Sequence, residues 1–589
     1  MEDLVFEEVR KPAAEDSAAH ARHARVPEAV PATEQPASAA ELPAPAADFP
    51  ARPEPRREKR NNLFLMVVEI VGLAIFAFYV AQDAYDNDLW FLLATGREIV
   101  ETGIPYVNPW TLHEGLGIVI QQWIPAVVLY LVHGTFGMAG LKVLVFAQIC
   151  LLTACLYALC RVCSDVRGRC GEVFLAIIAL AVPALQVYWS VRPHLYTMIM
   201  FTVLLIVLEK YRRTSDVRFA VLVPFVVLVH VNLHMSMAPF DLFVIALYAV
   251  PDVFSYLRAR DPQFKAGFGL SAYPRVPLLI ALGAAAVACV VNPYGIKGAL
   301  YLLESYGAAD YSGYINEMGA ASIWIDYGFA FLCSTVLGAM VIGRNGIERV
   351  NFPLTVLFIV LIPLTLMHVR NIWLLSLFAI PLIAQGFGRI SLDVPAAWPL
   401  SHRVVNGVLA AIVLAALAVP ASAALTYSTV EDEVEDDGDT PLKAMLYLNE
   451  YVQQTGVEKR SLRIYNSFNL GGYGEYYGYR VFMDPRPELW EPGITGVDRH
   501  YYKEFVDFSQ GRTDASEVVE EYQFDFLIAY SGSKLETAVR ARDDYERVFS
   551  GDGYTFWAKK TLTSAFNIDT DGLFAQIDAD DGADEEGEG

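Results

Sequence analysis

The chain has 589 residues, of which 54% are hydrophobic and 19% charged, and its mean hydropathy of +0.34 is positive. These values exclude a disordered or ordinary soluble chain and indicate an integral membrane protein. The net charge of −23 is concentrated beyond residue 429, which argues against an anionic macromolecule as a partner of that part, and we expect no nucleic-acid partner. The seven cysteines all lie in or beside apolar runs and form no disulfide or zinc motif.

Residues 1–60 are rich in Ala, Pro and Glu and poor in aromatic residues, so they predict a disordered tail. The basic run 56–60 then precedes the apolar stretch 62–81. This stretch is too long, and comes too late, for a cleaved signal peptide. It therefore predicts a first membrane span that is entered from the cytoplasm, with the tail on the cytoplasmic side.

The region 61–428 predicts about eleven spans, each long enough for a bilayer core of roughly 30 Å. The apolar stretch 118–135 decides the topology, because it also carries Gln121, Gln122, Pro125 and His133. If it crosses the membrane, every later basic loop becomes extracytoplasmic. If it lies along or dips into the outer face, those loops are cytoplasmic, as the positive-inside rule requires. We adopt the second interpretation, and the later spans are then 141–160, 173–190, 194–208, 220–231, 238–256, 277–291, 322–342, 352–367, 372–386 and 404–425.

Residues 429–562 predict an extracytoplasmic α/β domain. A helical pattern covers 441–454, and short apolar runs at 462–465, 480–483, 524–530 and 554–558 predict strands. Strands that alternate with helices favour an α/β sandwich. The acidic residues 563–589 predict a second disordered tail.

This topology gathers the unusual polar motifs at the outer face. Asp83, Asp86 and Asp88 follow the first span. Such carboxylates could hold a divalent cation, or one of them could act as a base toward an alcohol. The alternative is a solvated helix end. A divalent cation at Asp86 and Asp88 is the only cofactor that the sequence suggests.

Cationic side chains recur on the same face, at Arg192, His194, His230, His234 and Arg370. A guanidinium suits phosphate or carboxylate, although Arg192 could instead be an interfacial anchor. His230 and His234 have helical i, i+4 spacing, which favours a hydrogen-bonding pair over a metal site. Asn292-Pro293-Tyr294-Gly295 is typical of a helix-ending turn. The recurrence of cations predicts a site for an anionic, lipid-linked group.

Several motifs resemble those of uncharacterised bacterial membrane proteins of the GT-C glycosyltransferase type. The matching motifs are Asp86-Asn87-Asp88-Leu89-Trp90, Ala94-Thr95-Gly96-Arg97, Gly103-Ile104-Pro105, Arg192-Pro193-His194, Asn232-Leu233-His234, Asn292-Pro293-Tyr294-Gly295, Arg370-Asn371, Gly471-Gly472-Tyr473 and Asp484-Pro485-Arg486. The resemblance covers about residues 61–560. It implies sugar transfer from a polyprenyl-phosphate donor, with a carboxylate of the first outer loop, Asp88 or Asp86, as base or metal ligand. It also adds Arg97 to the substrate-binding residues.

The chain departs from this pattern at two places. Gln121-Gln122-Trp123 stands where the resemblance leads us to expect His-Glu-Trp, and an Asp is expected near Asn108. Amides bind ligands but cannot take up a proton. These departures bear on catalysis more than on the fold. The function that the resemblance implies, and that we prefer, is transfer of a sugar to an extracytoplasmic glycan or protein acceptor at the plasma membrane. The alternatives are a non-catalytic envelope protein that binds a lipid-linked glycan or scaffolds an assembly and, third, a transporter.

Overall fold

The computed structural model describes residues 87–163, 190–249, 273–307, 336, 338, 351–387, 441–486, 490, 492–551, 553–564, 566 and 568–575. All of them belong to one compact unit, Arg56–Gly589. Several predicted features lie wholly or largely outside the described residues, namely Asp83, Asp86, the tail 1–60, most of the tail 563–589, and the spans 62–81, 173–190, 322–342 and 404–425.

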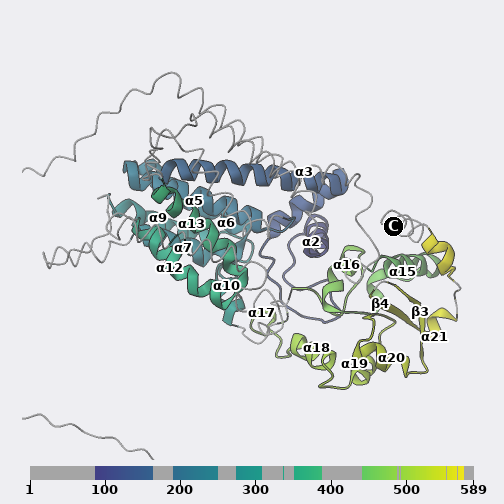
Figure 1. The fold of residues 1–589 in the computed structure, drawn as a ribbon. Coiled ribbons are helices and arrows are strands. Elements are labelled where there is room, and N and C mark those ends of the chain that lie inside the picture. Colours follow the sequence, from purple (N-terminus) through teal and green to yellow (C-terminus); the bar gives the residue numbers. More distant parts are fainter. Residues whose placement is uncertain are drawn as a thin grey trace, which may run out of the picture. The chain divides into compact units, whose positions relative to one another are not determined.

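The first part of the described chain is helical (Figure 1). Its elements are α2 Asp88–Thr102, α3 Trp123–Cys163, α5 His194–Thr214, α6 Val217–Leu233, η2 Met235–Met237, α7 Ala238–Ala249, α9 Val276–Cys289, α10 Ile296–Gly307, α12 Phe352–Met367, η6 Val369–Asn371 and α13 Ile372–Phe387. Helix α3 packs on α2 and α5, and α6 packs on α5 and α9. The described residues of the predicted spans 141–160, 194–208, 220–231, 238–256, 352–367 and 372–386 are thus helical, and 277–291 is helical as far as Cys289.

Two of these helices, α3 and α5, are long and apolar enough to cross a membrane. Five further apolar stretches of 10–17 residues are shorter than the roughly 20 residues of a typical span. The region is therefore helical and apolar as expected.

Helix α3 consists of two helical segments that meet at Gly137, whose φ of 62° and ψ of −158° are not helical. A Cβ atom at Gly140 would lie 3.1 Å from Cγ1 of Val132 and 3.3 Å from its carbonyl oxygen. In a continuous helix, residues eight positions apart are separated by about 12 Å along the axis. The chain therefore folds back at Gly137, and the stretch 123–136 is a separate segment from the predicted span 141–160.

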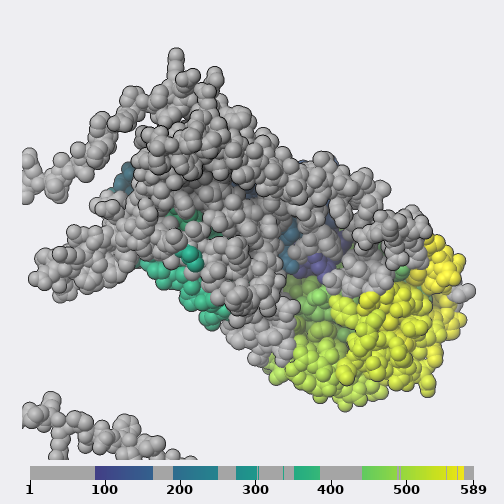
Figure 2. Space-filling view, viewed as in Figure 1, coloured from purple at the N-terminus to yellow at the C-terminus, as the bar shows by residue number. Residues whose placement is uncertain are grey.

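The C-terminal part contains a four-stranded sheet of order β1-β2-β4-β3, with β1 and β2 parallel and the other neighbours antiparallel. The strands are β1 Ile464–Asn466, β2 Phe526–Tyr530, β3 Tyr545–Ser550 and β4 Tyr554–Lys559. The helices are α15 Leu442–Thr455, η7 Lys459–Ser461, η8 Phe468–Leu470, α16 Gly471–Tyr476, α17 Pro492–Thr495, α18 Tyr501–Ser509, α19 Ala515–Tyr522, α20 Lys534–Arg540 and α21 Lys560–Thr563. Their residues form the green to yellow surface in Figure 2.

Both faces of this sheet are covered. Side chains of a strand alternate between faces, and along β2 the rings of Tyr447 and Tyr451 from α15 contact Phe526. The next residue, Leu527, belongs to the core on the other face, together with Val519 of α19 and Leu535 of α20. The result is the expected helix–sheet–helix sandwich.

Two strand predictions differ from the structure. Residues 480–483 form no strand, and Val481 instead makes an isolated bridge with Thr111 of the loop after α2. Strand β3 was not expected, because its exposed Glu546 and Arg547 hide the alternating pattern. It is an edge strand with a register irregularity between Arg547 and Phe549, and polar residues are usual on such edges.

Candidate functional site

A group of polar side chains gathers where α2 begins and where α5 begins. Asp88 is the first residue of α2, and its Oδ2 lies 3.3 Å from Nε of Arg192, just before α5. The side chains of Asp88 and Arg192 are 33% and 20% exposed, and Nε of Arg192 is itself buried. A carboxylate at a helix N-terminus is also favoured by the helix dipole. The structure thus brings together two of the predicted site residues.

His194 and His234 lie beside this ion pair. Their ring centroids are 6.0 Å apart, and the ring of Trp373 stands perpendicular to His194 at 5.9 Å. The side chains of Arg192 and Arg370 both act electrostatically on His194. We define Asp88, Arg192, His194, His234 and Arg370 as the cation cluster, a name that refers to its two arginines; the other members are one carboxylate and two imidazoles. Asp88 and His194 are the first residues of α2 and α5, Arg192 lies just before α5, His234 directly follows α6, and Arg370 belongs to η6.

Hydrogen bonding fixes the orientation of His234. Its Nδ1 lies 2.6 Å from Oγ1 of Thr197, in the first turn of α5. A hydrogen bond at one ring nitrogen sets the tautomer available at the other. Nε2 is therefore the nitrogen of His234 that remains for a ligand. Thr197 and Trp373 were not predicted, since a Thr and a Trp inside apolar helices carry no distinguishing signal.

His230 is a different case. Its Nδ1 lies 2.8 Å from Oδ2 and 3.1 Å from Oδ1 of Asp241, and both side chains are almost fully buried. The ring also stands edge-on to Phe201 at 4.8 Å. His230 thus joins α6 to α7, and we leave it out of the cation cluster. The i, i+4 spacing led us to expect that His230 and His234 act as one hydrogen-bonding pair, and in the structure the two imidazoles have separate partners.

Arg97 also lies elsewhere. Its Nη1 and Nη2 donate to the carbonyl oxygens of Tyr476 and Glu475, at 2.8 and 2.9 Å. These carbonyls are at the C-terminal end of α16, where a cation is favourable. Arg97 therefore attaches α2 to the C-terminal part, and the structure does not bring it to the cation cluster.

Two motifs of the C-terminal part, Gly471-Gly472-Tyr473 and Asp484-Pro485-Arg486, belong to the GT-C resemblance, and both contact α2 near α16. A Cβ atom at Gly472 would lie 3.2 Å from the backbone nitrogen of Phe91, and one at Gly471 would overlap the carbonyl oxygen of Met483. The ring of Trp90 in α2 stands edge to face with that of Tyr473 and is tilted against that of Tyr476, with both centroids at 4.8 Å. Gly472 thus allows α16 to approach α2 closely, and Gly471 allows it to approach the backbone at Met483.

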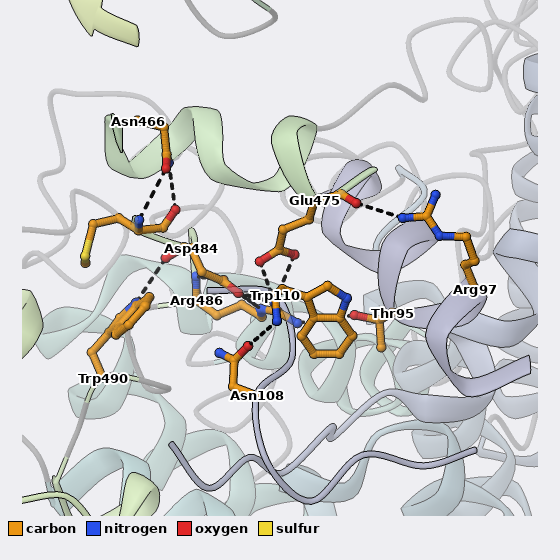
Figure 3. A network of polar contacts seen from close by, with 10 residues as sticks. Thr95, Arg97, Asn108, Trp110, Asn466, Glu475, Asp484, Arg486 and Trp490 are labelled. Carbon is orange, nitrogen blue, oxygen red and sulfur yellow. Dashed lines mark hydrogen bonds and ion pairs between the residues drawn. The ribbon is translucent and has the colours of Figure 1, made fainter. Parts of the chain in front are cut away.

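Arg486 lies at the centre of a buried polar network (Figure 3). Its Nε donates to both oxygens of Asp484, at 2.7 and 2.9 Å, and its Nη2 lies 3.1 Å from Oε2 of Glu475. Nη1 donates to Oγ1 of Thr95 in α2 at 3.2 Å. Its guanidinium also stacks on the ring of Trp110 at 5.0 Å.

Two fully buried carboxylates share this one guanidinium. Burial and the adjacent Asp484 carboxylate raise the pKa of Glu475 well above its ordinary value, against the opposing effect of Arg486. A protonated Glu475 leaves one negative and one positive charge, so the group is neutral when buried. We interpret this network as a structural joint between α2 and the C-terminal part.

The loop after α2 is held in the same joint. The backbone of Leu112 donates to Val481, and Val481 donates to Trp110, both at 2.9 Å. The His113 ring is enclosed by aromatic rings, of which Tyr501 is 4.1 Å away. Burial lowers the pKa of His113 to about 4. This histidine is therefore neutral near pH 7 and belongs to the core.

The structure describes both segments in which the sequence departs from the motifs of the GT-C resemblance. The carbonyl of Gln121 accepts from the backbone of Met235 at 2.8 Å, and Trp123 donates to Oδ1 of Asn232 at 3.2 Å. The Gln-Gln-Trp segment therefore lies against the chain on either side of His234. Asn108 is buried, and its Oδ1 accepts from the backbone of Trp110 at 2.9 Å. A carboxylate could accept that same bond, so Asn108 preserves the local turn.

Asn292 stabilises the turn between α9 and α10. Its Nδ2 donates to the carbonyls of Cys289 and Gly295, and its Oδ1 accepts from the backbone of Tyr294. Asn292-Pro293-Tyr294-Gly295 is therefore a helix-ending turn, as its sequence indicates.

Within the part of the chain that the structure describes, no three His, Cys, Asp or Glu side chains gather as a metal site. Asp86 lies outside that part, and the contact of Asp88 seen at this site is with Arg192. A cation at Asp86 and Asp88 stays a prediction.

No protein-family model and no curated protein sequence matches the chain. Among solved structures, it is similar to the Archaeoglobus fulgidus oligosaccharyltransferase, both apo and tethered to an acceptor peptide. The identity is 12%, the TM-score 0.46, and the match covers 78% of this chain and 69% of that one. It is also similar to the mycobacterial arabinofuranosyltransferase AftD, with 14% identity, a TM-score of 0.47, and coverage of 84% of this chain and 41% of that one. These identities and TM-scores are too low to carry a functional assignment.

Proposed function

We propose that the cation cluster binds the phosphate of a polyprenyl-phosphate-linked sugar and that the protein transfers this sugar to an extracytoplasmic acceptor. The convergence of Asp88 and Arg192 with the His194 and His234 rings carries the proposal. Ionisable groups are costly among apolar helices. Their meeting from separate segments is therefore better explained by a shared ligand than by chance.

The chemistry assigns a distinct role to each sign of charge. The bond between the anomeric carbon and the phosphate oxygen breaks, while the acceptor hydroxyl oxygen forms a bond to the same carbon. Asp88 takes the hydroxyl proton, and Arg192 with Arg370 stabilises the departing lipid phosphate. His234 presents Nε2 to the lipid phosphate, since Nδ1 is occupied by Thr197, and Nε2 donates a hydrogen bond in the tautomer in which the Thr197 hydroxyl donates to Nδ1.

Binding of a substrate phosphate would also change the basicity of the Asp88 carboxylate. In the structure described here, Arg192 pairs with this carboxylate at 3.3 Å. A phosphate oxygen that recruits the guanidinium weakens that pair, which raises the basicity of Asp88 when the donor is bound.

The second candidate is a protein that binds the lipid-linked sugar without turnover. The amides Gln121, Gln122 and Asn108 favour it, since none can take up a proton. This candidate uses the same cation cluster, but it assigns Asp88 only to the ion pair with Arg192.

Turnover and binding assays separate the two. Full-length protein in nanodiscs is incubated with a panel of polyprenyl-phosphate monosaccharides, and release of polyprenyl phosphate is measured. We expect Asp88→Asn to lower the rate by roughly 10²–10⁴-fold. The matched control is Asp543→Asn, at an exposed position of the C-terminal part, and it should keep full activity. Binding without turnover in the unmodified protein would favour the second candidate, and absence of both would overturn the proposal.

A further inference from the structure

Helix α10 presents an apolar stripe to its surroundings. Ile296, Leu300 and Leu303 are 62%, 39% and 60% exposed. Their i, i+4, i+7 spacing places them on one helical face. Gly298 and Tyr301, on the opposite face, are buried. The teal surface at the position of α10 and α12 in Figure 1 is visible in the space-filling view (Figure 2).

The buried face fixes the orientation of the helix. Helix α10 contacts η2 and α7. A Cβ atom at Gly298 would overlap Sδ of Met235 and would lie 2.6 Å from Oδ1 of Asn292. Because Met235 directly follows His234, α10 is held beside the cation cluster with its apolar stripe directed away from η2.

Helix α9, which precedes α10 in the chain, also carries exposed apolar side chains. Val276, Leu279, Ile280 and Val287 of that helix are each at least half exposed, and Val291 continues the surface up to the turn. Helix α9 contains no charged residue. A helix of this composition with exposed branched aliphatic side chains is typical of a lipid-facing surface.

The turn between the two helices has the chemistry of a membrane–water boundary. Tyr294 and the largely exposed Tyr106 stand edge to face at 5.4 Å. Their hydroxyls donate to the carbonyls of Pro105 and Pro293. Lys297, which follows the turn, is exposed. Tyr and Lys concentrate at bilayer interfaces, where a ring or an aliphatic stem meets lipid and a polar end meets water.

We infer that α10 is an interfacial helix whose stripe, Ile296, Leu300 and Leu303, lies among the acyl chains of the bilayer leaflet on the side of the cation cluster. Helices of this kind bury their apolar face roughly 5–10 Å below the headgroup boundary. The inference does not depend on glycosyl transfer. It gives the cation cluster a lipid-covered neighbour, so a lipid-linked anion could reach His234 without leaving the leaflet.

Depth-dependent quenching tests the inference. Leu303→Cys is labelled with an environment-sensitive fluorophore in full-length protein reconstituted into phosphatidylcholine vesicles, and the signal of identically treated unmodified protein is subtracted. We expect blue-shifted emission, a loss of fluorescence with lipids spin-labelled on their acyl chains, and little change with aqueous iodide. The control Ser509→Cys, exposed on α18, should show the reverse pattern.

Two results would overturn the inference. Iodide quenching at position 303 would place the stripe in water. Protection from both quenchers would mean that protein, either another segment or a second copy, covers it. A second measurement needs no substitution: photoactivatable lipids should cross-link to the peptide 296–303 of the unmodified protein, and absence of that cross-link would also contradict the inference.

Discussion

Oδ2 of Asp88 lies 3.3 Å from Nε of Arg192, so the first residue of α2 is paired with the residue two positions before α5. The pair links the predicted first outer loop to a later one. It also gives Arg192 a partner that an incoming phosphate must displace. A substitution of Asp88 or Arg192 therefore also changes the surroundings of the other residue.

The first prediction concerns Arg192 and polyprenyl phosphate. A guanidinium grips phosphate through two parallel hydrogen bonds, whereas an ammonium offers a point charge. Arg192→Ala should weaken binding by roughly 10- to 100-fold, the value of a charged hydrogen bond. Arg192→Lys should fall between it and the unmodified protein. Affinity is measured by titration of the lipid phosphate into nanodiscs.

Arg97→Lys is the matched control for Arg192. Arg97 is bonded to the carbonyls of Glu475 and Tyr476, so its replacement should leave the affinity unchanged. Equal affinity of the unmodified protein and both Arg192 variants would make Arg192 an interfacial anchor.

The second prediction separates His230 from the cation cluster. Asp241→Ala removes the hydrogen-bond partner of Nδ1 of His230, and both side chains are buried almost completely. A buried polar group left without its partner costs roughly 1–3 kcal/mol of folding free energy. Asp241→Asn keeps an oxygen acceptor for Nδ1 of His230 and should cost much less. Thermal unfolding in detergent measures both. An unfolding temperature equal in all three proteins would show that the pair adds no stability.

The third prediction is a pH dependence that arises from Glu475. Burial and Asp484 raise the pKa of this carboxyl above its ordinary value of 4.5. Between that value and the raised pKa, the folded protein holds a proton that the unfolded chain has released. Stability should therefore fall as pH rises through this window, by up to about 1.4 kcal/mol per pH unit.

Glu475→Gln cannot ionise and should flatten this part of the stability profile. The control Glu458→Gln is exposed and should leave the profile unchanged. The measurement is the unfolding midpoint in a series of buffers from pH 4.5 upward. A parallel profile for the unmodified protein and Glu475→Gln would contradict the prediction.

The fourth prediction concerns the contact between α2 and the first segment of α3. A Cβ atom at Gly96 would overlap the carbonyl of Ala126 and lie 2.6 Å from Cβ of Tyr130. Gly96→Ala should cost roughly 1–3 kcal/mol, as overpacking does. A Cβ at Gly134, within α3, meets nothing within 4 Å, so Gly134→Ala should be neutral or stabilising by up to about 1 kcal/mol. Equal unfolding temperatures for the two variants would refute the close approach.

The sequence alone was sufficient for the helices that coincide with apolar runs and for the ends at which polar groups occur, but it did not predict α10, α18, α19 or α20. Apolar runs long enough for helices stand out because burial or lipid contact demands a nearly continuous apolar stretch. Polar residues at the ends of such runs are recognisable because they end the apolar stretch. These residues are Asp88, Arg192, His234 and Arg370. The helix at 441–454 and three of the four strands were also predictable from their periodicity.

The tertiary structure alone decided which of these groups meet. Arg97 binds backbone carbonyls and His230 binds Asp241, and neither partner carries a sequence signal, because every residue has a carbonyl and a lone Asp can face any direction. The pairing of Glu475 and Asp484 around Arg486 likewise depends on how α2 docks on α16. Periodicity reports which face of an element is apolar. The partner of a polar group depends on how distant elements pack, which no local pattern records.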